Sequence, residues 1–149
     1  MDADTEKDLA AIEEPHRRDI EASRACDFLS STEGAMETYG DASQLYEVER
    51  RALHAERPGF RISELQISPT QKVPWHFHTN VQDTFYVIEG HIRIFLREPS
   101  EEVRLGPCET YSVRPRRPHL VMNGGDGSAT FLILQGVGEY DYVPLRGGS

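Results

Sequence analysis

Cysteine is scarce in this 149-residue sequence, which holds only Cys26 and Cys108. Two cysteines cannot build the disulfide framework of a small secreted domain. Neither of them has a partner at the spacing of a zinc site. The first residues, MDADTEKDLA, also lack the basic and apolar segments of a signal peptide. We therefore expect a cytoplasmic protein whose thiols stay reduced.

Long apolar runs and an excess of basic residues are lacking as well. No run approaches the roughly 18–20 apolar residues that a membrane-spanning helix needs, so we expect no membrane partner. Residues 1–50 carry 14 acidic and 5 basic side chains, whereas residues 51–149 carry 11 of each. The whole net charge of −9 therefore lies in the first third of the chain. Because an acidic arm repels phosphate and no basic stripe exists elsewhere, we expect no nucleic-acid partner.

The length is that of a single domain with an extension. We predict an acidic N-terminal extension over residues 1–43, with a helix between 16 and 29 and a linker from 30 to 43. From residue 44 to 149 the pattern changes to short segments that alternate in polarity and are separated by turn residues. We expect strands at 45–53, 60–67, 76–78, 84–90, 91–98, 101–105, 110–115, 119–123 and 129–136. Many short strands without an intervening helix predict an all-β sandwich or barrel, with a tight hairpin at Gly90.

Two histidines, His76 and His78, lie two positions apart in one of these segments. Side chains at this spacing point to the same face of a strand, so both imidazoles can be directed at one metal ion. By itself the pair is a weak indication, because two exposed strand histidines would look the same. An acidic residue, Asp83, and a glycine, Gly90, follow them.

A second segment makes the pattern more specific. It begins at Gly106 and contains His119 and Asn123 after a proline-rich turn. The first segment is similar to the first sequence motif of the cupins, and the second segment resembles their second motif. The resemblance covers about residues 60–135. It implies a cupin double-stranded β-helix, or jelly-roll barrel, in which four side chains bind one divalent transition metal ion (Fe, Mn, Ni, Co or Zn): His76, His78, Asp83 and His119.

The chain departs from the family pattern at several positions. Asp83 stands where most cupins have glutamate, and Gln82 is a rival ligand because the motif tolerates a spacing one residue shorter. Neighbours on a strand face opposite sides, so only one of these two side chains can point inward. We favour Asp83 because its distance to Gly90 is that of the family. In the second motif, Arg114 and Arg116 replace the usual proline and glycine.

The period of two also predicts the walls of the site. We expect a mostly apolar pocket, as small-molecule sites usually have, lined by Phe85, Val87, Tyr111, Val113, Val121 and Asn123. Trp75 either covers the mouth of this pocket or stacks on a substrate, or it anchors the packing at the rim of the barrel. Arg114, Arg116 and Arg117 either hold an acidic ligand or form a basic rim that pairs with the acidic extension.

The resemblance implies a metal-dependent enzyme that acts on a small organic molecule. A dioxygenase-type oxidoreductase is the first expectation, and an isomerase, lyase or cyclase is the alternative. A non-catalytic module that binds a small ligand is a third possibility, because one fold hosts many functions. No residue stands out as a general acid or base. We also expect a homodimer.

Overall fold

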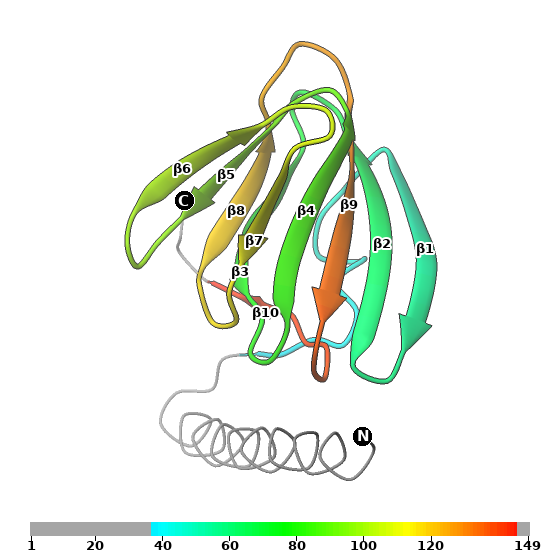
Figure 1. The fold of residues 1–149 in the computed structure, drawn as a ribbon, viewed down its shortest axis with the longest axis vertical. Coiled ribbons are helices and arrows are strands. Elements are labelled where there is room, and N and C mark those ends of the chain that lie inside the picture. Colours follow the sequence, from blue (N-terminus) through cyan, green and yellow to red (C-terminus); the bar gives the residue numbers. More distant parts are fainter. Residues whose placement is uncertain (1–36, 146–149) are drawn as a thin grey trace, which may run out of the picture. The chain divides into compact units, whose positions relative to one another are not determined.

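The computed structural model describes residues 37–145. The regular structure of these residues consists of β-strands, which confirms the all-β prediction (Figure 1). No helix in this range is long and apolar enough to cross a membrane. The strands are β1 Arg50–Arg57, β2 Phe60–Ile67, β3 Lys72–Phe77, β4 Gln82–Glu89, β5 Ile92–Leu96, β6 Glu101–Leu105, β7 Thr110–Val113, β8 His119–Asn123, β9 Ala129–Gly136 and β10 Val143–Pro144.

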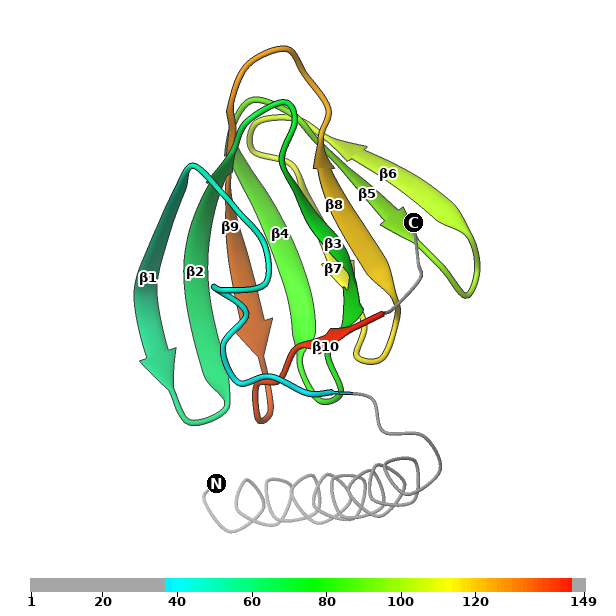
Figure 2. The same ribbon diagram turned by 180° about the vertical axis from the view of Figure 1, so that it is seen from behind.

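The strands form two antiparallel sheets of five, in the orders β1-β2-β9-β4-β7 and β10-β3-β8-β5-β6. The two sheets enclose the hydrophobic core between their inner faces (Figure 2). Alternation places one apolar set of each strand in this core, and each fully buried side chain contributes about 1.5–3 kcal/mol. Residues with no more than 1% exposure include Phe85, Val87, Ile92, Ile94, Val121 and Phe131.

The turn at Gly90 is not the hairpin that the sequence predicts. β4 and β5 belong to different sheets, so the chain crosses from one sheet to the other here. Gly90 has φ 78°, and a Cβ at this position would lie 2.6 Å from the carbonyl oxygen of Ser128. The turn therefore needs glycine for both its conformation and its space. A close connection between two strands indicates a sharp turn, but it does not show that the strands pair.

The first and last strands also differ from the sequence prediction. The strand expected at 45–53 is instead β1, Arg50–Arg57, and β10 was not expected. β1 has no buried residue. The alternation of polar and apolar residues therefore gives little indication of where this strand begins and ends. The apolar residues of the segment 45–48 are Leu45, Tyr46 and Val48, and they pack against the core from an irregular segment.

The compact unit that contains the barrel begins at Glu37, seven residues before the boundary expected from the sequence. Tyr39 exchanges two backbone hydrogen bonds with Tyr142, at 2.8 and 2.7 Å. Ala42 is buried in the core. Small residues without periodicity resemble a linker in sequence, although here they pack against the barrel. The helix predicted at 16–29 and residues 30–36 of the linker lie outside the described residues.

Candidate metal centre

Four buried side chains from three parts of the chain converge between the sheets. His76 is on β3, His78 follows the end of β3, Asp83 is on β4 and His119 begins β8. Their potential ligand atoms all lie within 4.8 Å of one another, and none of the four residues is more than 3% exposed. We call these residues the histidine–aspartate cluster. Its members belong to both sheets, so the cluster exists only when the barrel is closed.

Local sequence explains how β3 presents its histidines. The pairing of β3 with β8 shifts register between Val73 and His76, at Pro74 and Trp75. Proline has no N–H to donate to the ladder, so a bulge is expected there. After the bulge His76 lies directly opposite His119, and the two ring centroids are 4.3 Å apart.

Each histidine is oriented by a hydrogen bond from its Nδ1 atom to a backbone carbonyl. Nδ1 of His76 donates to Pro74 and Nδ1 of His119 donates to Arg117, both at 2.8 Å. Nδ1 of His78 donates to Asp141. A carbonyl can only accept, so each Nδ1 carries the proton. The Nε2 atoms are thereby left as the metal-binding atoms, which is the usual orientation of metal-binding histidines.

Asp83 is the acidic member of the cluster. Its Oδ2 atom lies 3.0 Å from Nε2 of both His78 and His119, and its Oδ1 accepts a hydrogen bond of 2.8 Å from Gln135. Gln82 is exposed and points away, with its amide near Thr84. The structure therefore brings Asp83 to the histidines and leaves Gln82 outside, as alternation along a strand requires.

One buried atom of the cluster has no partner among the described residues. Nε2 of His78 is close to Asp83 Oδ2, but the approach lacks the geometry of a hydrogen bond. A lone pair that faces a carboxylate is unfavourable unless a proton or a cation lies between them. Three imidazoles and one carboxylate form a donor set that divalent iron, manganese, nickel, cobalt or zinc accepts. The cluster therefore fits a metal ion.

Burial and the charges within the cluster shift the pKa values of its members in different directions. Burial and the imidazoles of His119 and His78 hold the pKa of His76 well below its usual value. Burial alone would raise the pKa of Asp83, but His78 and His119 outweigh it and hold the pKa well below the usual value. Burial alone would lower the pKa of His78, but Asp83 outweighs it and raises the pKa. Asp83 is thus ionised and His76 neutral at neutral pH.

The family model described as a cupin domain matches residues 63–141, which is more than half of the chain. The chain belongs to the cupin family. No curated protein matches it in sequence.

Solved structures resemble this cupin in fold. A Klebsiella pneumoniae protein with a double-stranded β-helix domain is 20% identical with a TM-score of 0.57, covering 65% of this chain and 84% of that one. Lactobacillus farciminis oxalate decarboxylase is 13% identical with a TM-score of 0.58, over 68% of this chain. An oxalate oxidase is 15% identical with a TM-score of 0.54, over 58% of this chain. The cupin spans 34% of the decarboxylase and 46% of the oxidase, and these likenesses concern the fold.

The cavity beside the cluster has a volume of about 20 Å³, which is roughly the space for one water molecule. Two of the predicted wall residues, Phe85 and Val121, line it. Val87 and Val113 are buried but lie outside its lining. The inward face of a strand continues past the cavity, so a buried residue of that face need not line it.

Three further residues predicted to line the site contact other parts of the barrel. Asn123 donates two hydrogen bonds to backbone carbonyls, at 3.2 and 2.8 Å, and so holds the loop that follows β8. Tyr111 places its hydroxyl near Glu101 at 3.3 Å. Trp75 lies on the opposite face of β3 from His76, with the Arg97 guanidinium 4.0 Å from its ring centroid. Trp75 is not among the residues that line the cavity.

The arginines of the second motif support a loop. Arg117 is buried and donates to the carbonyls of Arg97 and Pro99 and to Glu101. Arg114 donates to the carbonyl of Glu98. Arg116 has φ 68°, so the position where the family has glycine keeps the left-handed backbone that glycine favours. Arg114 and Arg117 thus hold the loop at 97–101. Most of the acidic extension, with which a basic rim would pair, lies outside the described residues.

Sequence reasoning missed four residues that complete the site. The ring of Tyr142 stacks on His76 with centroids 4.3 Å apart, and Tyr46 lines the same cavity. Gln135 contacts Asp83, and the Asp141 carbonyl orients His78. Gln135 could have been found, because it is a polar residue at an inward position of β9. The other three lie in irregular segments without a periodic pattern.

Proposed function

We propose that the histidine–aspartate cluster binds one divalent transition metal ion and that this cupin is an enzyme acting on a small organic molecule. The first candidate is a dioxygenase-type oxidoreductase. The observation that carries the proposal is the set of three Nδ1-to-carbonyl hydrogen bonds, which direct three Nε2 atoms toward one buried carboxylate. Such backbone support is what holds ligands in place in metal sites.

When bound, the ion would supply a Lewis acid and, in the case of iron or manganese, a redox centre. The chain itself supplies three other features. Gln135 holds Asp83 in position through its 2.8 Å hydrogen bond. The small cavity beside the cluster, about 20 Å³, has room for roughly one water molecule. The Tyr142 hydroxyl is buried without a partner among the described residues, so it can donate a hydrogen bond to an oxygen atom of a guest in this cavity.

Tyr142 acts in this proposal as a neutral donor. Burial, with the neighbouring Tyr46 and Tyr140, raises the pKa of Tyr142 far above its usual value. The phenol therefore keeps its proton throughout the physiological pH range.

The second candidate is a lyase, which requires the metal only as a Lewis acid. The solved structures that resemble this cupin include both an oxidase and a decarboxylase, so both reaction classes occur among proteins of similar fold. An isomerase or cyclase would use the same polarising role of the metal. A ligand-binding module without catalysis is the third alternative.

Metal analysis of the full chain, purified without added metal, tests the proposal together with oxygen uptake. We expect about one equivalent of metal, and its loss in His119→Ala. Iron with oxygen consumption in the presence of small organic acids supports the oxidoreductase. Zinc or nickel with turnover but no oxygen uptake supports the lyase or isomerase. A folded protein that binds no added divalent ion would overturn the metal site.

A further inference from the structure

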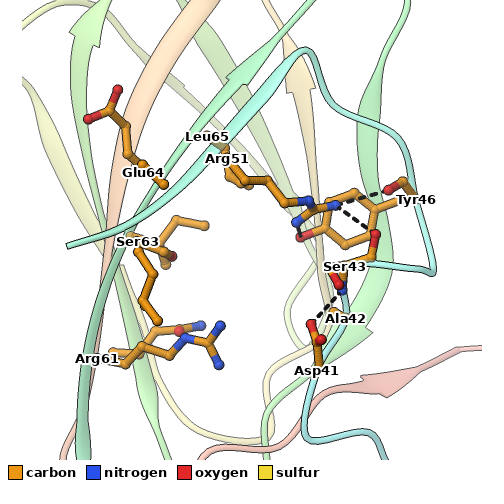
Figure 3. Close-up of a pocket in the computed structure, with 13 residues that line it drawn as sticks. Asp41, Ala42, Ser43, Tyr46, Arg51, Arg61, Ser63, Glu64 and Leu65 are labelled. Carbon is orange, nitrogen blue, oxygen red and sulfur yellow. Dashed lines mark hydrogen bonds between the residues drawn. The ribbon is translucent and has the colours of Figure 1, made fainter. Parts of the chain in front are cut away.

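A second pocket lies on the inner face of β1 and β2, next to the metal centre. Its volume is about 130 Å³, close to the roughly 150 Å³ that admits a benzene-sized guest in another protein. Its lining includes Tyr46, Arg51, Arg61, Ser63, Ile133 and Gln135. Figure 3 shows Arg51 and Arg61 extending into it from the side opposite Asp41, Ala42 and Ser43. We call it the arginine pocket.

The two arginines differ in how they are engaged. Arg51 donates hydrogen bonds to the carbonyls of Ser43 and Tyr46, at 3.4 and 2.9 Å (Figure 3). These bonds connect the irregular segment 43–46 to β1. Arg61 has a single ion pair among the described residues, with Glu56 at 3.8 Å. The Nε atom of Arg61 is buried and has no hydrogen-bond partner among them.

A buried guanidinium N–H without a partner requires an explanation, because such groups in native proteins are almost always paired. The edge of an arginine that carries Nε matches the two oxygens of a carboxylate. The hydroxyl of Ser63, two residues along β2, lines the same pocket. The two acids that line the pocket are engaged elsewhere: Asp41 accepts the Ser43 N–H at 2.9 Å, and Glu64 pairs with Arg50 and His54. The face of the Arg61 guanidinium lies over the Tyr140 ring, with Cζ 4.3 Å from the ring centroid. This contact leaves the Nε edge of Arg61 without a hydrogen-bond partner among the described residues and able to bind a guest anion.

Strand register places Arg61 close to the cluster. Arg61 pairs with Gln135 across β2 and β9, and Gln135 pairs with Asp83 across β9 and β4. Two strand spacings separate the backbones of Arg61 and Asp83 by about 10 Å. Tyr46, Ile133 and Gln135 line both the arginine pocket and the cavity beside the cluster. The two spaces are therefore separated by side chains and not by backbone.

We infer that the arginine pocket binds a small carboxylic acid, with its carboxylate on Arg61 and its other end toward the histidine–aspartate cluster. That this acid is the substrate of the histidine–aspartate cluster rests on the proposed function. The Arg61 contact itself needs no metal.

The test uses succinate as the probe and succinamide as its neutral analogue, with the full chain in metal-free and zinc-loaded forms. The Nε–H resonance of Arg61, assigned by its disappearance in Arg61→Lys, should shift on addition of succinate and not of succinamide. Calorimetry should show that Arg61→Gln weakens succinate binding about tenfold or more, the effect of losing a charged hydrogen bond. Arg57→Gln, an exposed change of equal charge on β1, should bind like the wild type.

An unmoved Arg61 resonance in the folded wild-type chain, or equal binding of succinate and succinamide, would overturn the arginine pocket. Unchanged succinate affinity in Arg61→Gln would do the same. Because the resonance is measured on the wild-type chain, the test survives even if Arg61→Gln fails to fold. If succinate shifts the resonance but the chain binds no metal, the proposed function fails and the pocket stands. If metal binds but the resonance does not move, the pocket alone fails.

Discussion

A divalent ion that binds the histidine–aspartate cluster must displace a proton from His78. Nδ1 of His78 is held by the Asp141 carbonyl, so the ion can only use Nε2. Asp83 raises the pKa of His78 against the effect of burial, while Asp83 itself is ionised and His76 neutral. At pH values below this raised pKa, the metal-free cluster holds a proton near Nε2 of His78, and the ion competes with it.

The size of the effect follows from this competition. Below the raised pKa of His78, each unit of falling pH should weaken apparent metal affinity about tenfold, or about 1.4 kcal/mol, for this one proton. The same proton stabilises the metal-free fold below the usual histidine value of about 6.5 and ceases to do so as pH rises through the raised pKa. Ionised Asp83 stabilises the fold above about 3.9, and this is lost as pH falls through its lowered pKa.

Zinc titrations against a chelator across pH 6 to 8, corrected for the chelator's own protonation, measure the slope. Calorimetry in buffers of different ionisation enthalpy measures the proton released. The control is Asp83→Asn, which removes the carboxylate that contributes most to raising the pKa of His78 and should reduce proton release while weakening binding. Zinc affinity that does not change with pH in the wild type, without proton release, would refute the assignment of this proton to His78.

Three further predictions concern the support of the site and of the barrel. Gln135→Leu should weaken zinc binding about 10- to 100-fold, because Asp83 loses the hydrogen bond that holds it. The control Gln82→Leu, on the exposed face of β4, should leave zinc binding unchanged. Equal zinc affinities of the two variants in chelator competition would contradict this role of Gln135. Tyr142→Phe should raise the melting temperature of the metal-free protein, because it deletes a buried hydroxyl whose lack of a partner costs about 1–3 kcal/mol, and a lower value in calorimetry would show that the hydroxyl has one. Gly90→Ala should destabilise the fold by about 1–3 kcal/mol in urea unfolding, since its φ is 78° and the new Cβ would meet a carbonyl oxygen at 2.6 Å, whereas Gly127→Ala, with nothing within 4 Å, should be close to neutral.

Part of the site follows from local pattern. Two histidines at a spacing of two must share a face wherever the backbone is extended, and Asp83 and Gln82 must face opposite sides. The same rule predicts that Phe85 and Val121 face inward, as they do. It cannot say how far along the barrel each inward residue lies from the cluster. Val87 is inward like Phe85 but does not line the cavity, because it lies one pair further along β4.

The residues that complete the site come from places without a periodic pattern. Asp141 and Tyr142 lie between β9 and β10, and Tyr46 lies before β1. Their contacts depend on where irregular segments cross the barrel. Trp75 is the sequence neighbour of His76, and alternation along the strand therefore puts the two side chains on opposite faces.

Sequence by itself determined the strand-rich fold, the family resemblance and the four members of the cluster, because period, turn residues and motif spacing are properties of nearby residues. Only the tertiary structure decided which atoms of the histidines face one another and that Gln135 holds Asp83. The tertiary structure also decided that Arg61 lines a pocket beside the cluster. These facts depend on the register of strands far apart in the chain, such as β2 with β9 and β9 with β4. Register is set by packing of the whole barrel, and a local segment does not contain it.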